Sequence, residues 1–587
     1  MNFKRQHPAV FLVFMLTFIS VWCFGQKTGA SSQSPDYKTT TCRSSFVKVK
    51  IEGENNAANI EKVVKNTFEN LKDTRCGLKL NYRKTSIGGY HYSFTQTFSG
   101  IAVYQSEIKI NTDKGNIIHS VFDNSYDTRN WNLNTANAGD NAVIAIAPLT
   151  GLPVVAQLSI IKHSLETLTL DGAVIFQRDM NCYFAAPDSL VSGKVFNPDP
   201  LTTAGHVYDT ITYNNNNGAD APWLDAQEQI VSFRANFDGV KFTLQSPYVQ
   251  VVSFDTFAPN VAPVTSTTPQ FYFNRSQSGF IDVNAFYHIS THHNYIRSLG
   301  FDCSDSLMLI DTHESTADQS FFAPPNTISY GLGGVPDAED ADVIVHEYCH
   351  SVSYTAAPGS NVGGQRNALD EAFCDYNAAA YSKSLNTFMD QWVYNWDGHN
   401  EFWNGRVVNS TRVYPTDLDN SIYDNGEIWS STLFSLNGDI GRETTDSLII
   451  QAHYSYAQSM SMADAAILLI DADSLISGGA HYCPIYERLL EHGFVQQNDL
   501  CAAAGITESK TDAVQFIQNG NSFTLFTNDN SYIRLQILDI TGRQLATVPD
   551  EFRSVYNYQN QGLPSGIYLV NVLTENGVST FKWVKAK

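Results

Sequence analysis

The sequence predicts a multidomain protein of the α+β class. The chain has 587 residues, a length that corresponds to three or four domains of ordinary size. Alternating strand patterns dominate residues 31–260 and return in residues 507–587, whereas residues 280–500 carry the longer periodic stretches typical of helices. Aromatic residues make up 12% of the chain, a proportion that suits β-rich packing. We therefore expect β-rich regions at both ends and helices between them.

The composition excludes several classes of protein. Hydrophobic residues make up 43% of the chain and charged residues 16%, which excludes a disordered or fibrous chain. The 59 acidic residues outnumber the 37 basic ones, so the formal net charge is −22. An acidic chain of this kind is a poor candidate for binding nucleic acid or an anionic membrane surface, and we expect neither as a partner.

The amino terminus predicts a signal peptide at residues 1–25. Lys4 and Arg5 precede an apolar run from Ala9 to Phe24. This run is shorter than a typical membrane-spanning helix. An uncleaved anchor is the alternative. No second apolar run of membrane length follows, so we expect the rest to be exported with no transmembrane segment after signal removal.

Three regions follow the signal segment. Residues 26–190 show alternating strands and one early helix near Ile60–Leu71, and residues 191–500 begin as strands and become helical. Residues 507–587 consist of short strands between turns and predict a C-terminal β-sandwich. The helices that we expect in the middle region are Ala285–Leu299, Ala338–Ala356, Asn367–Ser384, Gly426–Leu436 and Met462–Ser474.

The cysteine count permits disulfides in an exported chain. Of nine cysteines, Cys23 leaves with the signal peptide, and the remaining eight are an even number. Cys349 and Cys374 could pair or could be buried free thiols, and both interpretations stay open. The local pairs that we expect are Cys42 with Cys76 and Cys483 with Cys501.

Residues 346–350, His-Glu-Tyr-Cys-His, form an H-E-x-x-H motif. On a helix, His346 and His350 lie about 40° apart on one face, so both imidazoles can reach one ion. Glu347 projects about 100° from His346, next to such an ion rather than on it. A base in that place can take a proton from an attacking water. The alternative is a pair of surface histidines.

A catalytic zinc needs a third protein ligand, and the helix predicted at 367–384 offers one. Glu371 follows His350 after enough chain for a turn and a return helix, and Asp375 lies one turn further on the same face. Asp375 can accept a hydrogen bond from a ligand imidazole. Asp370 is a rival ligand, but it points about 100° away from Glu371. The alternative is an ordinary amphipathic helix with acidic residues.

His288 and His292 have the same four-residue spacing, but no acidic residue lies between them. We expect them to pack inside the protein rather than to bind a second metal ion.

The motif HEYCH followed by Glu371 and Asp375 resembles the gluzincin metallopeptidases, and within them the fungalysin branch, which is related to thermolysin. The resemblance implies one zinc ion, with His346, His350 and Glu371 as ligands and Glu347 as general base and acid. It also implies a two-lobed fold, with a β-rich lobe and a helical lobe around the zinc cleft. Residues 26–190 would be a propeptide and residues 191–500 the peptidase domain. The segments that carry this resemblance beyond the motif are residues 91–117, 195–200, 284–301 and 425–434.

The family resemblance suggests further site residues. Ser320 and Phe321 match the edge strand on which relatives bind extended substrate. Arg406 resembles an arginine that contacts the substrate carbonyl, with a surface salt bridge as the alternative. Relatives have a histidine that stabilises the oxyanion where this chain has Tyr423, and a phenol can also donate that hydrogen bond. Asp342 matches a family calcium ligand, but no matching cluster of acids follows Glu371, so calcium is unsupported.

The C-terminal strands resemble the sorting domain of the type IX secretion system over residues 535–545 and 563–585. A small carbohydrate-binding or adhesive domain is the alternative. The resemblance implies passage through the type IX machinery, followed by release or surface attachment.

Together these features predict a secreted or cell-surface zinc endopeptidase made as a zymogen, which acts as a monomer on protein or peptide substrates. Two alternatives remain. A zinc aminopeptidase would need an acidic group for a free amino terminus, and the sequence shows no clear motif for one. A surface binding protein with a weakened site would explain Tyr423, but the intact metal motif argues against it.

Overall fold

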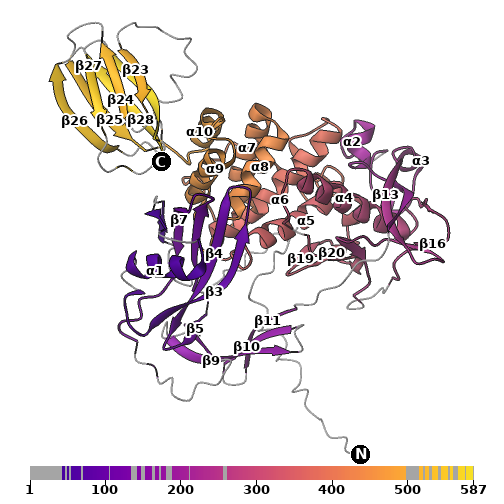
Figure 1. Cartoon of the computed structure of the whole chain (residues 1–587). Coiled ribbons are helices and arrows are strands. Elements are labelled where there is room, and N and C mark those ends of the chain that lie inside the picture. The colour runs from indigo at the N-terminus through magenta and orange to yellow at the C-terminus, as the bar shows by residue number, and fades with distance from the viewer. Residues whose placement is uncertain are drawn as a thin grey trace, which may run out of the picture.

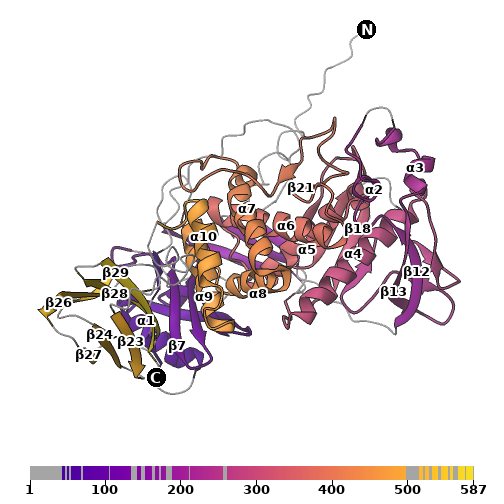
Figure 2. The same ribbon diagram turned by 90° about the horizontal axis from the view of Figure 1, so that it is seen from above.

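The computed structural model has strand-rich regions on two sides of a helical middle (Figure 1). In both ribbon views the N-terminal sheet and the C-terminal strands lie near α9 and α10, while β12 and β13 lie at the opposite end (Figure 2). The signal segment 1–25 and the residues of most interdomain connections lie outside the described part of the chain. The structure describes residues 43–46, 49–51, 55–67, 71–104, 106–131, 133, 142–146, 153–161, 165–170, 173–179, 188–209, 212–254, 261–303, 305–496, 514–519, 522–527, 532–539, 544–552, 555–559, 563, 566–574 and 577–585.

The N-terminal region forms an 11-stranded sheet, with the order β1-β7-β6-β4-β5-β8-β9-β10-β11 and with β2 on β7 and β3 on β4. Tyr92 and Phe94 of the alternating run are buried against α1 (Ala57–Thr67), as the period-two pattern predicts. Gln96 is also buried, and its Nε2 donates to Tyr126 O at 2.9 Å. The strands are β1 (Arg43–Ser45), β2 (Val49–Lys50), β3 (Cys76–Thr85), β4 (Gly89–Phe98), β5 (Ile101–Val103), β6 (Ile108–Asp113), β7 (Ile117–Asp123), β8 (Ala142–Ile146), β9 (Pro153–Ile161), β10 (Leu165–Leu170) and β11 (Ala173–Asp179).

Two further sheets form the β part of the middle region. One has five strands in the order β16-β14-β13-β12-β17, and the other has four in the order β15-β18-β20-β19, so β19 is an edge strand. Two short helices, α2 (Pro200–Ala204) and α3 (Pro222–Asp225), accompany them. The strands are β12 (Asp188–Val195), β13 (Gln229–Phe237), β14 (Phe242–Thr243), β15 (Val249–Val251), β16 (Thr265–Ser266), β17 (Gln270–Phe271), β18 (Met308–Ser315), β19 (Phe321–Ala323) and β20 (Thr327–Gly331).

Seven longer helices complete the middle region and share one continuous apolar core with its sheets. The short ribbon of β21 (Trp392–Val393) and β22 (Arg406–Val407) lies beside α6 and α7. Buried polar side chains interrupt the core mainly along α5 and α6. The helices are α4 (Gly279–Ser298), α5 (Ala341–Ala356), α6 (Gly364–Leu385), α7 (Ile422–Ile440), α8 (Arg442–His453), α9 (Met462–Ile476) and α10 (Tyr482–Glu491).

The C-terminal strands form two sheets with a common core. One sheet has the order β23-β24-β27 and the other β26-β25-β28-β29. Phe523 from the first sheet and Trp583 from the second are fully buried, with ring centroids 5.2 Å apart. Face-to-face packing of this kind is typical of a β-sandwich. The strands are β23 (Val514–Asn519), β24 (Ser522–Thr527), β25 (Tyr532–Leu538), β26 (Gln544–Phe552), β27 (Val555–Gln559), β28 (Gly566–Thr574) and β29 (Gly577–Lys585).

The mixed α/β content agrees with the predicted α+β class, but some helix boundaries differ. Helix α4 begins at Gly279, six residues before the predicted start, and α7 begins at Ile422, where the Ser421 hydroxyl accepts from Asp424 N and caps it. The helices α8 and α10 were not predicted at all. Helix α8 follows α7 after the single residue Gly441, α10 follows α9 after five residues, and each is shorter than the helix before it.

The structure decides between the two interpretations of Cys349 and Cys374. Cys349 and Cys374 are buried free thiols, so the interpretation as a mutual disulfide is wrong. Cys483 is disulfide-bonded, while its predicted partner Cys501 lies outside the described residues. Cys76 is a buried thiol and not half of a disulfide, so its predicted pairing with Cys42 is wrong, and its Sγ lies 2.9 Å from Thr128 Oγ1.

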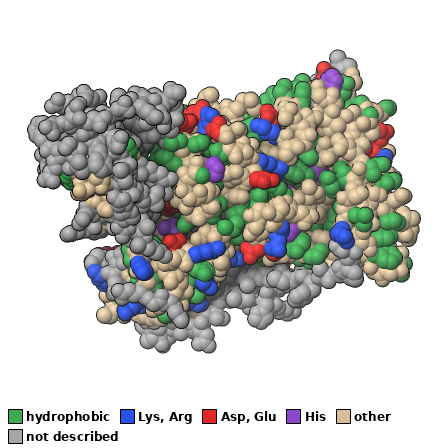
Figure 3. Space-filling view, turned by 45° about the horizontal axis from the view of Figure 1, so that its top comes forward, with side chains coloured by type: hydrophobic (Ala, Val, Ile, Leu, Met, Phe, Trp, Pro, Cys, Tyr) green, Lys and Arg blue, Asp and Glu red, His purple; other side chains and the backbone are tan. Residues whose placement is uncertain are grey.

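The surface seen in Figure 3 carries Lys and Arg side chains scattered among acidic and apolar ones. Within the described residues, no helix is both long and apolar enough to cross a membrane.

Candidate metal centre

Helix α5 carries the H-E-x-x-H motif into the protein interior. The helix begins after Asp340, whose side chain accepts a hydrogen bond from Asp342 N at 2.8 Å and caps the first turn. The apolar residues 343–345 are buried ahead of the motif. His346 and His350 follow on one face with their ring centroids 4.8 Å apart, and both are almost fully buried.

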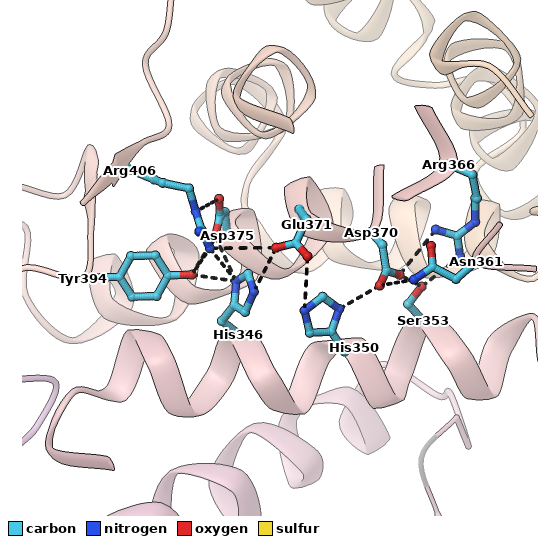
Figure 4. Close-up of polar contacts among 10 residues, drawn as sticks. All are labelled: His346, His350, Ser353, Asn361, Arg366, Asp370, Glu371, Asp375, Tyr394 and Arg406. Atoms are coloured by element: carbon cyan, nitrogen blue, oxygen red, sulfur yellow. Dashed lines mark hydrogen bonds and ion pairs between the residues drawn. The ribbon is translucent and has the colours of Figure 1, made fainter. Parts of the chain in front are cut away.

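Helix α6 places Glu371 opposite both imidazoles (Figure 4). Its carboxylate oxygens lie 3.3 Å from His346 Nε2 and 3.9 Å from His350 Nε2. Two ligands of one tetrahedral zinc lie about 3.3–3.4 Å apart, so these distances are close to those of a shared ion. Gly426 of α7 contributes to this position, because a Cβ there would lie only 3.2 Å from Ala368 O of α6. The missing side chain lets α7 approach the back of α6.

His346 is held by a polar group on the cavity side. Its Nδ1 lies 2.9 Å from Asp375 Oδ1 and 2.7 Å from the Tyr394 hydroxyl, which leaves Nε2 toward Glu371. Arg406 makes a bidentate pair with Asp375 through Nε at 2.7 Å and a terminal nitrogen at 2.8 Å. The β21–β22 ribbon brings Arg406 to this place by pairing it with Val393.

His350 is held by a second polar group, which is buried. Its Nδ1 lies 2.7 Å from Asp370 Oδ2. Asn361 Nδ2 donates to the same oxygen at 2.9 Å, and Ser353 Oγ donates to the other. Arg366, which is fully buried, lies 3.3 Å from Asp370 Oδ1. Asp370 is therefore not a rival ligand but a partner of the second imidazole, a role that the sequence analysis missed.

The electrostatics favour a cation between the imidazoles. Burial alone would lower the pKa of His350, but Asp370 and Glu371 outweigh it and raise that pKa to about 10. Burial would also lower the pKa of His346, but Asp375 and Glu371 outweigh this effect and raise that pKa. Glu371 Oε1 is a buried oxygen with no hydrogen-bond partner among the residues that the structure describes. An oxygen and two nitrogens arranged in this way fit a zinc ion.

Cys374 is a second possible third ligand, because its Sγ lies within 4.8 Å of a nitrogen of each motif histidine. Only an ionised thiolate is a good zinc ligand. Burial raises the pKa of the Cys374 thiol well above its usual value, whereas the two histidines hold the pKa of Glu371 below the ordinary one against the effect of burial. Glu371 is thus the ionised group in the absence of the ion, and its oxygens lie 3.3 and 3.9 Å from the two histidine nitrogens, which favours it as the third ligand.

Glu347 faces a cavity of about 580 Å³ that opens beside the two imidazoles. Its Oε2 is buried and makes no hydrogen bond within the described part of the chain, and burial raises the pKa of its carboxyl. An unpartnered carboxylate with a raised pKa suits proton transfer near neutral pH. The other residues around the cavity are Gln319, Ser320, Asp337, Val343, His346, His350, Glu371, Tyr394, Asp397, Asn400, Glu401, Phe402, Trp403, Asn404, Gly405, Arg406, Ser421, Tyr423 and Asp424.

The structure also brings the remaining predicted site residues to this cavity or its border. Tyr423, in the first turn of α7, lines the cavity, and the Arg406 guanidinium lies 5.0 Å from its ring centroid. Arg406 does form a salt bridge, with Asp375, and its side chain is 13% exposed in the wall of the cavity, so its contact with a substrate carbonyl stays a prediction. Ser320 donates a hydrogen bond to Asp337 Oδ2 at 2.5 Å, and Phe321 begins the edge strand β19.

His288, His292 and Asp342 have structural partners. His288 lies 2.8 Å from both the Tyr381 hydroxyl and Phe196 O, and His292 Nε2 lies 3.4 Å from Cys349 Sγ. The two histidines thus bind separate parts of the core and not one ion. The Asp342 carboxylate accepts hydrogen bonds from Ser382 Oγ and from the backbone N–H of residue 394.

Comparison with known proteins gives one informative match. No curated protein matches this chain. Among solved structures, the FMN-binding beta-glucuronidase from Facaelibacterium prausnitzii L2-6 is similar at 9% identity over 87% of this chain and 74% of its own, and its TM-score of 0.10 carries no argument. Residues 80–125, which extend from β3 to just beyond β7, match the Fungalysin/Thermolysin Propeptide Motif. This match supports a peptidase of the fungalysin or thermolysin type that carries its own propeptide.

Proposed function

We propose that the protein is a zinc-dependent endopeptidase made as a zymogen. The observation that carries the proposal is the convergence of His346, His350 and Glu371, with the unpartnered Glu347 beside them in one cavity. The propeptide motif at residues 80–125 supports the same class of enzyme. We propose the two-lobed arrangement of that class for residues 191–500.

The three ligands would hold the zinc ion, which when bound polarises a carbonyl and makes an attacking water more acidic. Glu347 takes the proton of that water and passes it to the leaving amine. Tyr423 donates a hydrogen bond to the oxygen on which negative charge develops. Arg406, fixed by Asp375, offers its remaining N–H groups to a substrate carbonyl.

The edge strand β19 supplies a way to hold the substrate. Its outer side has no strand partner among the described residues, and the residues just before it line the cavity. An extended peptide could add to this edge through backbone hydrogen bonds while its scissile bond reaches Glu347. Binding of this kind selects an extended main chain rather than a particular side chain, which suits cleavage inside proteins.

An aminopeptidase is the second candidate, because the cavity contains carboxylates that no sequence motif predicted. Asp337, Asp397, Glu401 and Asp424 all line it. One of them could hold the free amino group of a substrate terminus. A binding protein with a weakened site is the third candidate.

The remaining features of the proposal concern export. We propose that residues 1–25 are a signal peptide, that residues 26–190 are the propeptide and that residues 507–587 are the sorting domain recognised by the type IX secretion machinery. The processed enzyme would then be secreted or held at the cell surface as a monomer that acts on proteins or peptides.

A peptidase assay with a metal chelator tests the proposal. Processed wild-type protein should cleave casein and internally quenched peptides, and a chelator and Glu347→Gln should each abolish cleavage. Glu443→Gln, at an exposed position on α8, should leave it unchanged. Cleavage that survives both treatments would contradict the zinc mechanism. Release of terminal residues without internal cleavage would favour the aminopeptidase, and zinc-loaded protein without turnover would favour the binding protein.

A further inference from the structure

The N-terminal sheet contacts the turn between α8 and α9, which comprises residues 454–461. Asn124 Nδ2, just after β7, donates to Gln458 O at 2.6 Å, and Gln458 N donates to Glu107 Oε2 at 3.1 Å. Asn124 and Glu107 are both 3% exposed. Ser93 Oγ donates to the other oxygen of Glu107 at 2.7 Å, so this carboxylate is fixed within the N-terminal sheet.

The same turn holds the loop between α5 and α6, which comprises residues 357–363. The Gln458 side chain donates through Nε2 to Gly359 O at 3.0 Å, and Ser459 N donates to Val362 O at 2.7 Å. The contact is tight, because a Cβ on Gly363 would lie 3.0 Å from Ser459 Cα. A displacement of the turn would therefore displace the loop.

The 357–363 loop in turn holds the partner of His350. Asn361 Nδ2 and His350 Nδ1 both bind Asp370 Oδ2, at 2.9 and 2.7 Å. Ser360 Oγ lies 3.2 Å from Arg366, which is the buried cation beside Asp370. The Arg366 guanidinium lies 5.1 Å from the ring centroid of Tyr456, a residue of the 454–461 turn. Loop and turn thus fix the rotamers of both Asp370 and Arg366.

From this continuous set of contacts we propose that the docked N-terminal sheet positions His350. Gln458 is the positioning residue that connects the sheet to the loop beside His350. The inference rests on the proposed zinc site. Within the described residues, the partners of His346 come instead from α6 and from the region of β21 and β22 (Figure 4). While the sheet is docked, His350 is held in the orientation that binds the ion. Loss of the docking contacts loosens one ligand of three and speeds metal release.

The size of the effect follows from the length of the route. Direct hydrogen-bond partners of ligand histidines typically change metal affinity by about 10–100-fold when removed. Gln458 acts through the loop and Asp370, so we expect about a threefold to tenfold faster release of zinc.

Zinc release into a chromogenic chelator, measured on the full chain, tests the proposal. Asn124→Ala and Gln458→Ala should each release zinc faster than wild type, and the double variant should be no faster than the more affected single one. Ser44→Ala is the matched control, since Ser44 Oγ donates across the same interface to Asp464 Oδ1 at 2.6 Å, and Asp464 belongs to α9 rather than to the turn or the loop. It should release zinc like wild type.

Cobalt substitution gives a readout of ligand geometry that a general loss of stability would not produce. The visible absorption of bound Co²⁺ should shift in Asn124→Ala and Gln458→Ala but not in Ser44→Ala. Identical release and spectra in all variants would overturn the inference and leave the zinc site intact. Wild-type protein that holds no zinc would instead overturn the proposed function.

Discussion

The two imidazoles of the candidate metal centre lie one helical turn apart, yet they are supported in different ways. His346 is bound by Asp375, which also fixes Arg406 at the wall of the cavity. His350 is bound by Asp370 within a closed group of buried side chains. Support on the cavity side can therefore act on the substrate as well as on the metal, whereas support on the closed side can act only on the metal.

The largest expected effect comes from the third ligand. Glu371→Ala removes the carboxylate that faces both imidazoles, and we expect loss of zinc and of measurable peptidase activity, because two imidazoles alone rarely complete a catalytic zinc site. Zinc content and cleavage of a quenched peptide measure this. Cys374→Ala should retain both properties, and loss of zinc in this control instead would assign the third ligand to the thiol.

On the cavity side, Tyr423→Phe should lower kcat about 10²–10³-fold, since removal of one oxyanion donor typically costs about 2.7–4 kcal/mol. Zinc content should not change. Tyr456→Phe is the control on the closed side, because the Tyr456 hydroxyl is buried without a hydrogen-bond partner among the described residues. Its kcat should remain near that of wild type. Equal kcat values for the two variants would remove Tyr423 from the mechanism.

A pair of substitutions compares the two supports directly. Asp375→Asn and Asp370→Asn should each lower zinc affinity about 10–100-fold, because each weakens the partner of one ligand imidazole. Only Asp375→Asn should also lower kcat of the zinc-saturated enzyme, because it releases Arg406. Competition with a chelator and steady-state kinetics at saturating zinc separate the two effects. The comparison fails if both variants lose kcat equally.

The last comparison of the two supports concerns the pH dependence of zinc affinity. Binding requires neutral imidazoles, and the pKa of His350 near 10 means that zinc must displace a proton at pH 7–9. Affinity should therefore rise with pH over this range, by about tenfold per pH unit for one displaced proton. Asp370→Asn should lower the pKa of His350. The zinc affinity of this variant should therefore be weaker than that of wild type, and it should rise less with pH. Parallel pH profiles for wild type and variant would contradict this pKa assignment.

The sequence predicted the groups whose spacing lies on a single helix. The four-residue spacing of His346 and His350, and of Glu371 and Asp375, placed each pair on one face, and the structure brings the two faces together. Asp370 binds His350 at Nδ1, whereas Glu371 faces Nε2. Helical periodicity could not reveal this contact, because it depends on how α5 packs on α6.

Residues that enter from loops gave no such signal. Tyr394 follows a two-residue strand, and nothing around it in the sequence marks a contact with His346. Arg366 did have a usable signal, since it lies four residues before Asp370 on the same helix and forms an ion pair with it. The start of α7 had another, because Ser421 three residues before Asp424 is a typical N-cap pattern.

The central claim is that one zinc ion binds between His346, His350 and Glu371, and anomalous diffraction at the zinc edge tests it most directly. We predict a single strong peak within about 2.0–2.2 Å of His346 Nε2, His350 Nε2 and a Glu371 oxygen. A crystal grown with zinc that shows no peak among these three side chains, or a peak bound to Cys374 in place of Glu371, would contradict the account.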